Sequence, residues 1–353
     1  MRKAVARFNV RIGSALAVVM LATWLPQGAA SAADAVRIGY TKNAGDAALY
    51  IADTKGYFKA ENIDIALVYF DSGARMVAPL GTSELDVGTL PGSAGLSNAA
   101  SRQINNRIVA DRSRSAPGYL YQTLMVRKDL IDSGRFKGYP DLKGLKMAVA
   151  APGISILSVV NEAMKKGGRA YADVEIVFGG FPQQVAGFRN KTIDAAIMIE
   201  PFATGIVASG DAVRFISTED FYPGDQFTFL VYGERFATAR TDVAKRFMRA
   251  YVRGIRDFND AIDNGRWATN ARGDEVLAII AKYLELKPEQ IRASYPHACD
   301  PNGDVNLDSM RKDLAFFRQI GEVTSKDIKV EDIVDLSFVQ QAVRELGSYK
   351  PTK

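Results

Sequence analysis

Few residues in this chain are of the types that catalyse reactions or bind metal ions. It has one histidine, His297, and one cysteine, Cys299, two positions apart. A structural zinc site takes four such ligands, so the pair does not predict one. Asp and Asn alternate over residues 300–306 as in a calcium loop, but Arg311 stands where the closing glutamate of an EF-hand would be. We therefore expect no metal, no cofactor and no catalytic residue; Cys299 is a candidate exposed thiol, and a turn should precede a helix at 307–320.

Short motifs point the same way, towards binding rather than catalysis. The sequence contains no Gly-x-Ser-x-Gly elbow, no P-loop and no Gly-x-Gly-x-x-Gly motif. Instead, small polar residues and glycines follow short apolar runs at 41–46, 71–75, 90–93, 151–155 and 179–183. Glycine lets a ligand approach the backbone, and open parallel sheets bind ligands beyond the carboxyl ends of their strands. Helix N-termini at such loops offer free N–H groups to anions.

We predict ligand contacts from twelve residues in or near these loops. They are Asn43, Asp46, Gly73, Ala74, Arg75, Gly92, Ser93, Tyr121, Gly153, Ser155, Gln183 and Glu200. Backbone N–H groups near Gly73 and the hydroxyl of Ser93 suit an anion, and the Arg75 guanidinium can bind a carboxylate or sulfonate in bidentate fashion. Glu200, at the end of an apolar run, could hold an ammonium group of the ligand.

Structural roles remain open for the same side chains. Asn43 and Asp46 are of types that cap helices, and Arg75 could be a solvated surface residue. A buried carboxylate must be paired, so Glu200 could instead bond backbone N–H groups of the scaffold. Five aromatic residues near the loops could stack on a ligand or pack the lobes together: Tyr119, Tyr121, Phe181, Phe202 and Phe227.

Alternating short apolar runs and helical patterns would position these loops. Strands are predicted at 36–40, 63–70, 85–88, 146–150, 174–178, 195–199 and 213–217, and helices at 47–55, 74–80, 155–166, 183–189, 202–208 and 244–264. Repeated β-α-β units predict parallel sheets covered by helices. Two extended stretches, 119–127 and 226–232, are predicted to cross between two α/β blocks.

The first residues have the order of a secretory signal peptide. A basic start comes from Arg2, Lys3, Arg7 and Arg11. An apolar run over 12–25 follows, then an Ala-Ser-Ala cleavage site at 30–32, and the run is shorter than the roughly 20 residues a membrane span needs. We therefore expect an exported, periplasmic protein that starts at Ala33. Of the 45 basic residues four precede that point, so 41 basic and 40 acidic residues remain and no nucleic-acid partner is expected.

Four stretches occur in an order and at spacings that a known family shares. They are GY at 39–40 with YIA at 50–52 and KGYFKAENI at 55–63, SELDVG at 83–88, DLKGLK at 141–146 with AAPG at 150–153, and IDAA at 193–196 with EP at 200–201. The tail at 334–342 adds to the likeness. In these stretches the chain resembles the nitrate, sulfonate and taurine binding proteins of ABC importers, a group that also includes pyrimidine-precursor binders. The likeness covers nearly all of the chain after residue 33.

This resemblance implies an α/β protein of the type II periplasmic-binding-protein fold, with two lobes around a ligand cleft joined by two crossing segments. We place the signal peptide at 1–32, one lobe at 33–121 plus 228–353, and the other at 122–227. The implied partners are a small-molecule ligand, a membrane permease and its ATPase, and the chain is expected to be a monomer.

The predicted function is capture of a small organic anion or zwitterion by lobe closure. The ligand would be sulfonate- or taurine-like, or an aromatic carboxylate. The alternatives are a pyrimidine-precursor binder, a biosynthetic enzyme of the same fold, or a periplasmic ligand sensor.

Overall fold

Met1, Ala4 and residues 32–351 are described by the computed structural model. The chain divides into two units, residues 1–32 and residues 33–353, and the following paragraphs concern the second. The predicted signal peptide lies outside the described residues except for Met1, Ala4 and Ala32. Within the described part of the chain, no helix is both long and apolar enough to cross a bilayer.

The first sheet has five strands in the order β2-β1-β3-β10-β4. They are β1 (Asp34–Tyr40), β2 (Ile63–Tyr69), β3 (Val87–Pro91), β4 (Arg107–Arg114) and β10 (Gln226–Tyr232). β1 is parallel to β2 and β3, whereas β10 is antiparallel to both β3 and β4. The sheet is therefore mixed. The prediction of a parallel sheet is wrong here because the chain re-enters the sheet from the opposite end.

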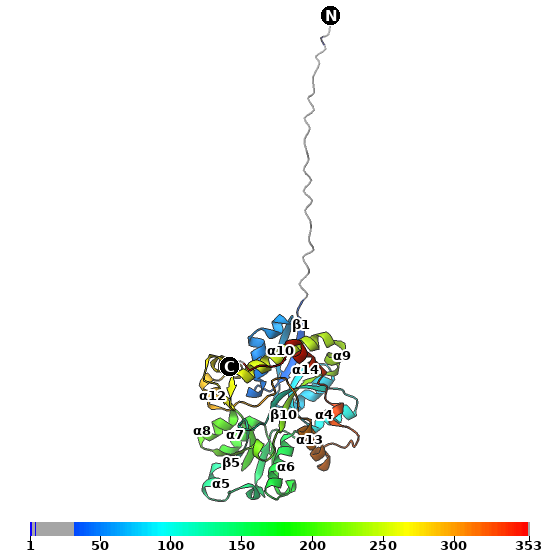
Figure 1. Cartoon of the computed structure of the whole chain (residues 1–353). Helices are drawn as coiled ribbons and strands as arrows, with labels where there is room; N and C mark the ends of the chain where they lie inside the picture. Colours follow the sequence, from blue (N-terminus) through cyan, green and yellow to red (C-terminus); the bar gives the residue numbers. More distant parts are fainter. Residues whose placement is uncertain (2–3, 5–31, 352–353) are drawn as a thin grey trace. The chain divides into compact units, whose positions relative to one another are not determined.

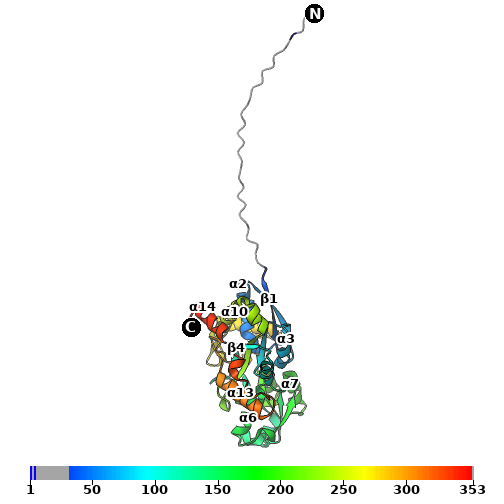
Figure 2. The ribbon, with the colours of Figure 1, turned by 90° about the vertical axis from the view of Figure 1, so that its right-hand side faces the viewer.

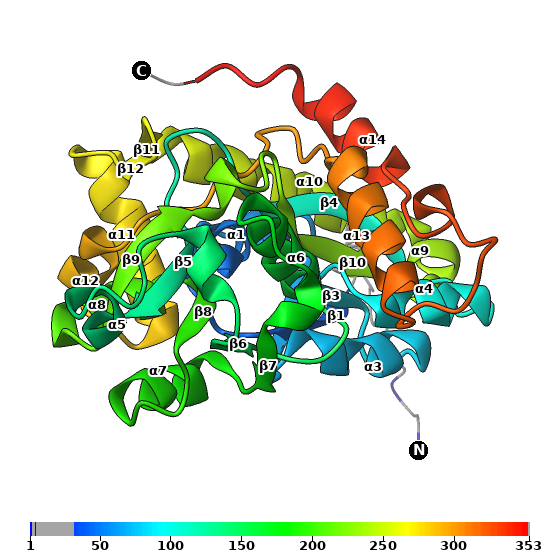
Figure 3. The same ribbon diagram turned by 90° about the horizontal axis from the view of Figure 1, so that it is seen from below.

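The second sheet also has five strands, in the order β7-β6-β8-β5-β9. They are β5 (Gln122–Arg127), β6 (Lys146–Val149), β7 (Glu175–Phe178), β8 (Ala195–Ile199) and β9 (Ala212–Ser217). β6 is parallel to β7 and β8, and β5 is antiparallel to β8 and β9. Figure 3 shows these strands in this order across the view.

The chain crosses to the second sheet between β4 and β5 and returns between β9 and β10. The crossings occupy residues 115–121 and 218–225, so each predicted crossing stretch is mostly strand. The helices around the second sheet, α5 (Lys128–Asp132), α6 (Ile156–Lys166), α7 (Phe181–Arg189) and α8 (Phe202–Ser209), lie at the end opposite to α10 (Thr241–Asp260) and α14 (Ser337–Leu346) (Figures 1 and 2). The lobe boundaries at 121 and 227 stay predictions.

The longest described helix, α10, packs on α1 (Ala47–Thr54) and α14. Its buried residues recur every three or four positions, as in Val243, Phe247 and Tyr251, which gives it one apolar face. Gly254 lies on this face. Glycine is required there because a Cβ atom would be 2.1 Å from the Ala48 carbonyl oxygen. A side chain at this position would push α10 off α1.

Other short elements complete the described chain. The helices are α2 (Tyr57–Ala60), α3 (Val77–Gly81), α4 (Ala94–Ser101), α9 (Glu234–Ala239), α11 (Ala271–Leu284), α12 (Pro288–Ala293) and α13 (Leu307–Gln319). The 3-10 helices include η1 (Ala44–Asp46) and η2 (Gly73–Met76), and β11 (Ile262–Asp263) pairs with β12 (Arg266–Trp267).

Most predicted elements are confirmed within a few residues, and β8 and β10 match their predicted ranges. The helix predicted at 74–80 begins as the 3-10 helix η2, and the strand predicted at 85–88 starts two residues later. β4 was not predicted at all, although it is the edge strand that contributes two residues to the site described next.

Candidate ligand-binding cavity

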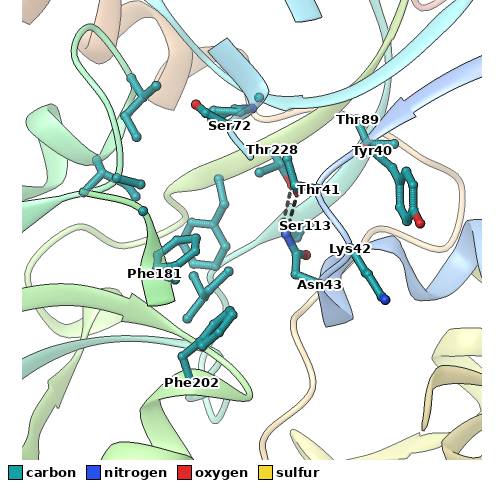
Figure 4. A pocket seen from close by; sticks show the side chains of 18 of the residues that line it. Tyr40, Thr41, Lys42, Asn43, Ser72, Thr89, Ser113, Phe181, Phe202 and Thr228 are labelled. Carbon is teal, nitrogen blue, oxygen red and sulfur yellow. Dashed lines mark hydrogen bonds between the residues drawn. The ribbon is translucent and has the colours of Figure 1, made fainter. Parts of the chain in front are cut away.

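A cavity of about 470 Å³ lies between the ends of strands from both sheets. All five of the predicted loops contribute to its lining, at residues 41–43, 71–73, 91, 154 and 180–182. The side of the first sheet is mostly polar, with Thr41, Asn43, Ser72, Arg112, Ser113 and Thr228. The side of the second sheet is mostly apolar, with Ile154, Ile156, Phe181, Pro182, Ile199 and Phe202. Figure 4 shows Phe181 and Phe202 across the cavity from Asn43 and Ser72.

Arg112 of β4 organises the polar wall. Its Nε donates to Asp46 Oδ1 at 2.8 Å, its Nη1 to Thr228 Oγ1 at 2.9 Å and its Nη2 to Asn43 Oδ1 at 2.9 Å. The Arg112 side chain is only 3% exposed and that of Asp46 is fully buried. Burial acts to lower the pKa of Arg112, but the Asp46 carboxylate and two tyrosines outweigh it, so the pKa is raised. The wall therefore holds an ion pair without net charge.

Asn43 caps a helix and also lines the cavity, so its predicted ligand contact stays a prediction. Its Oδ1 accepts from the Gly45 N–H at 2.9 Å, which caps η1. Its Nδ2 donates to Thr41 Oγ1 at 2.7 Å, the contact dashed in Figure 4. The Tyr121 hydroxyl donates to the same Oδ1 at 3.4 Å, so the amide links both walls of the cavity.

Gln122, the first residue of β5, also lines the cavity and is 4% exposed. Its Oε1 is buried and receives no hydrogen bond from the residues that the structure describes. Elsewhere in the lining, Ser113 and Thr228 share a hydroxyl–hydroxyl hydrogen bond. A buried amide oxygen without a hydrogen-bond donor is costly, so Gln122 Oε1 is a polar atom of the cavity lining that a ligand N–H could satisfy.

Aromatic rings surround the apolar side. Phe181 and Phe202 stack with centroids 5.5 Å apart and an interplanar angle of 21°. The ring centroids of Tyr121 and Phe227 are 6.3 Å apart. All four rings line the cavity. Tyr119, the fifth aromatic residue considered from the sequence, is not among the lining residues. These rings offer faces on which a ring-sized ligand could stack.

A row of rings runs inward from Tyr121. The ring centroid of His297 is 5.2 Å from that of Tyr121 and 4.3 Å from that of Phe258, on which it stacks. The Phe258 and Trp267 rings meet edge to face, with centroids 6.0 Å apart. His297 is 1% exposed, and neither ring nitrogen has a hydrogen-bond partner within the described chain. Burial lowers its pKa well below the usual value, with Arg112 adding to the effect, so the imidazole is neutral.

Cys299 is buried, so the proposal of an exposed thiol is wrong. Burial raises the pKa of the thiol well above its usual value, and Asp111 raises it further. The Asp/Asn stretch forms a turn in which Asp300 Oδ1 accepts from the Asn302 N–H at 2.9 Å, ahead of α13. In the described residues, no three His, Cys, Asp or Glu side chains are grouped as a metal site requires.

Three of the twelve predicted residues line the cavity: Asn43, Gly73 and Tyr121. Asp46 lies behind the wall and acts through Arg112. Ala74 does not line the cavity, and Arg75 points to solvent, where its 71% exposed side chain pairs with Asp71 at 3.3 Å. Arg75 therefore takes the surface role considered for it.

Gly92, Ser93, Gly153 and Ser155 contact one another instead of the cavity. The Ala94 N–H donates to the Gly153 carbonyl and the Ser155 N–H to the Gly92 carbonyl, both at 2.8 Å. Ser93 Oγ accepts from the Leu96 N–H at 3.2 Å and so caps α4. The Ala94 and Ser155 N–H groups are thus engaged between the two loops, and none of the four predicted residues lines the cavity.

Glu200 is part of the scaffold. Its side chain is fully buried and accepts hydrogen bonds from the Thr204 N–H and hydroxyl, each at 3.0 Å, and from Arg214 Nη2. Burial raises its pKa even though Arg214 and Thr204 lower it. Glu200 does not line the cavity, and the exposed Gln183 does not either, although Phe181 and Pro182 beside it do.

The sequence profile of the NMT1-like family matches residues 29–266. The chain belongs to the NMT1-like family. It is 28% identical over 212 residues to a putative ABC transporter periplasmic binding protein of Brachyspira hyodysenteriae, and this match spans 57% of each chain. It is 25% identical over 326 residues, 89% of each chain, to a putative aliphatic sulfonates-binding protein of Bacillus subtilis.

Among solved structures, the periplasmic nitrate-binding protein NrtA from Synechocystis superposes with a TM-score of 0.71 at 13% identity, over 89% of each chain. At this identity the likeness concerns the fold alone. The resemblance stated from the sequence and the periplasmic-binding-protein fold are thereby confirmed.

Proposed function

We propose that this protein is the solute-binding component of an ABC importer and captures a small organic molecule in the cavity between its two sheets. The observation that carries the proposal is the lining itself, which joins a polar wall from one sheet to an apolar wall from the other. The expected setting is the periplasm. The expected partners are a permease and its ATPase, with the binding protein as a monomer.

Binding would act by closing two lobes, residues 33–121 plus 228–353 and residues 122–227. A ligand that touches both walls binds a closed form better than an open one and shifts the population towards it. The crossings at 115–121 and 218–225 would serve as hinges, since they are the segments through which the chain passes between the sheets.

The cavity favours an organic molecule over nitrate. Its volume of about 470 Å³ lies in the usual range for small-molecule sites, roughly 300 to 1,000 Å³. Phe181, Phe202 and Ile199 offer apolar surface that an inorganic anion would not use. Sulfonates and aromatic carboxylates remain the ligand classes expected from the sequence.

A biosynthetic role is disfavoured by the position of the reactive side chains. His297 and Cys299 are buried, and neither lines the cavity. A nucleophile or base must reach the reacting atom within hydrogen-bond distance, directly or through one water.

A thermal-shift screen of residues 33–353, followed by small-angle scattering, tests the proposal. The panel holds sulfonates, taurine, aromatic carboxylates and amides, pyrimidines, nitrate and amino acids. A ligand at a hundred times its dissociation constant should add about 2.7 kcal/mol of stability. Compaction with a stabilising compound is the expected result, whereas binding without any compaction would contradict lobe closure.

A further inference from the structure

The charges that line the cavity are balanced in pairs. Within the described chain, the charged lining residues are Lys42, Asp71 and Arg112. Each has an opposite charge in contact: Glu285 at 2.7 Å from Lys42, Arg75 at 3.3 Å from Asp71, and Asp46 at 2.8 Å from Arg112. The lining together with these partners carries no net charge.

An anion would therefore enter this cavity without a free cation to receive it. Transfer of an ionised group from water is costly unless a counter-charge replaces the lost hydration. Arg112 is committed to Asp46, yet only three of its N–H groups are used, on Asp46, Thr228 and Asn43. A guanidinium has five N–H groups, so Arg112 can still donate to an uncharged acceptor oxygen.

Gln122, in contrast to Arg112, needs a hydrogen-bond donor from the ligand. Its buried Oε1 lacks a hydrogen-bond donor among the described residues, and Gln122 is part of the cavity lining. A sulfonate, a nitrate or an ionised carboxylate group has no N–H or O–H to offer this oxygen. An amide group has both an acceptor oxygen and an N–H donor, and it carries no charge.

We propose that the preferred ligand is an uncharged molecule with a ring-sized apolar body and a carbonyl or sulfonyl oxygen next to an N–H group. The oxygen accepts from Arg112, the N–H donates to Gln122 Oε1, and the ring lies against Phe181 and Phe202. This rests on the proposed function and replaces the organic anions expected from the sequence with uncharged amides and their cyclic relatives.

Matched pairs of probes that differ in charge but hardly in shape test this inference. We would measure the affinities of benzamide and benzoate, and of benzenesulfonamide and benzenesulfonate, by calorimetry at pH 7.5 with residues 33–353. Each amide should bind at least tenfold more tightly than its anion. An anion that binds as tightly as its amide overturns the inference.

Two substitutions separate the polar contacts from the charge balance. Gln122→Leu should weaken benzamide binding about tenfold, because the N–H of the ligand then loses its acceptor, and should leave benzoate unchanged. Gln340→Leu, an equal change on the exposed face of α14, should alter neither affinity. Glu285→Gln should strengthen benzoate binding selectively, because it releases Lys42 from its ion pair.

The outcomes distinguish this inference from the proposed function. Unchanged benzamide affinity in Gln122→Leu, or no binding by any of the four probes, overturns the inference. The proposed function is judged separately, by scattering and by mass spectrometry of any compound released on denaturing the purified protein. An anion that binds and compacts the protein would support the function while refuting the preference for an uncharged ligand.

Discussion

Asp46 and Asp225 are both 1% exposed, yet the protein accommodates their carboxyl groups in opposite ways. Asp46, behind the cavity wall, forms an ion pair with Arg112 through Oδ1. Asp225, at the end of the return crossing before β10, has no hydrogen-bond partner for either oxygen within the described residues. The charge of Asp46 is neutralised by a cation, whereas Asp225 has no cation in contact within the described residues.

The surroundings of Asp225 favour the protonated form. Burial raises its pKa well above the usual value, and the Asp313 and Glu219 carboxylates raise it further, while Ser309 and Lys312 lower it in part. Asp313 on α13 accepts from the Tyr222 hydroxyl at 2.8 Å, and burial raises its pKa to about 7. The comparison shows that a buried carboxyl group can be tolerated in two ways, by pairing its charge with a cation or by taking up a proton.

The largest effect is expected where pairing is lost. Arg112→Met should destabilise the fold by about 3 to 5 kcal/mol, because it leaves the buried Asp46 charge uncompensated. The double substitution Asp46→Asn with Arg112→Met should recover much of this loss. Urea unfolding of the two variants measures the difference, and equal losses in both would show that the charge of Asp46 is not the cause.

A smaller loss of stability is expected when the buried Glu200 carboxylate loses its cation. Arg214→Met removes its cation, but the Thr204 N–H and hydroxyl still bond the carboxylate. We expect a loss of about 2 kcal/mol in the free energy of unfolding at pH 7.5. Since burial already raises the pKa of Glu200, the loss should shrink at pH 5, where the group takes up a proton more readily. A loss independent of pH would argue that packing, not charge, is responsible.

The acid cluster should give the protein a pH-dependent stability with a defined sign. Because the folded pKa of Asp313 is about 7 and lies above the ordinary value of about 4, its contribution is complete below pH 4 and is lost as the pH rises through 7. Asp313→Asn should therefore stabilise the protein at pH 8 by at least on the order of 1 kcal/mol, less at pH 5, and hardly at all near pH 4.

Melting temperatures at pH 5 and pH 8 test this for Asp313. Some slope should persist in the variant, since burial raises the pKa of Asp111 to about 6 and acts in the same direction. A native protein that is more stable at pH 8 than at pH 5 would contradict the assignment of protonated carboxyls to this cluster.

The smallest effect on stability is expected for an ion pair at the protein surface. The Lys42–Glu285 pair joins side chains that are 31% and 79% exposed, so water screens it. Glu285→Gln should change stability by less than about 1 kcal/mol. A larger loss in thermal denaturation at high salt would be inconsistent with a screened surface pair.

Sequence patterns were informative where local structure decides the outcome. Short apolar runs followed by glycine and polar residues located all five loops of the cavity, since a strand end and a helix start are local features. β4 escaped prediction because Asp111, Arg112 and Arg114 interrupt its apolar pattern. Asp111 and Arg112 are buried and Arg114 is partly buried, and their partners Asp46 and Asp300 come from distant parts of the chain.

Individual contacts depend on tertiary approach and were therefore harder to predict. The loops at Gly92 and Gly153 look like anion sites in isolation, and only their mutual hydrogen bonds show that the N–H groups are already occupied. Glu200 was correctly recognised as a residue that must be paired, but its partner Arg214 could not be identified from spacing. Gln122 gave no signal beyond its place within the predicted crossing stretch at 119–127.

The row of rings from Tyr121 to Trp267 gives the protein a built-in optical reporter. The sequence has two tryptophans, Trp24 and Trp267, so a chain that starts at Ala33 fluoresces through Trp267 alone. Its indole Nε1 donates to the Ser294 carbonyl at 3.0 Å and its ring is 6% exposed, which fixes the environment of the fluorophore. Because Tyr121 lines the cavity and the rings of His297 and Phe258 connect it to Trp267, we expect a ligand that displaces Tyr121 to change the emission of Trp267, which would allow binding to be followed without labels.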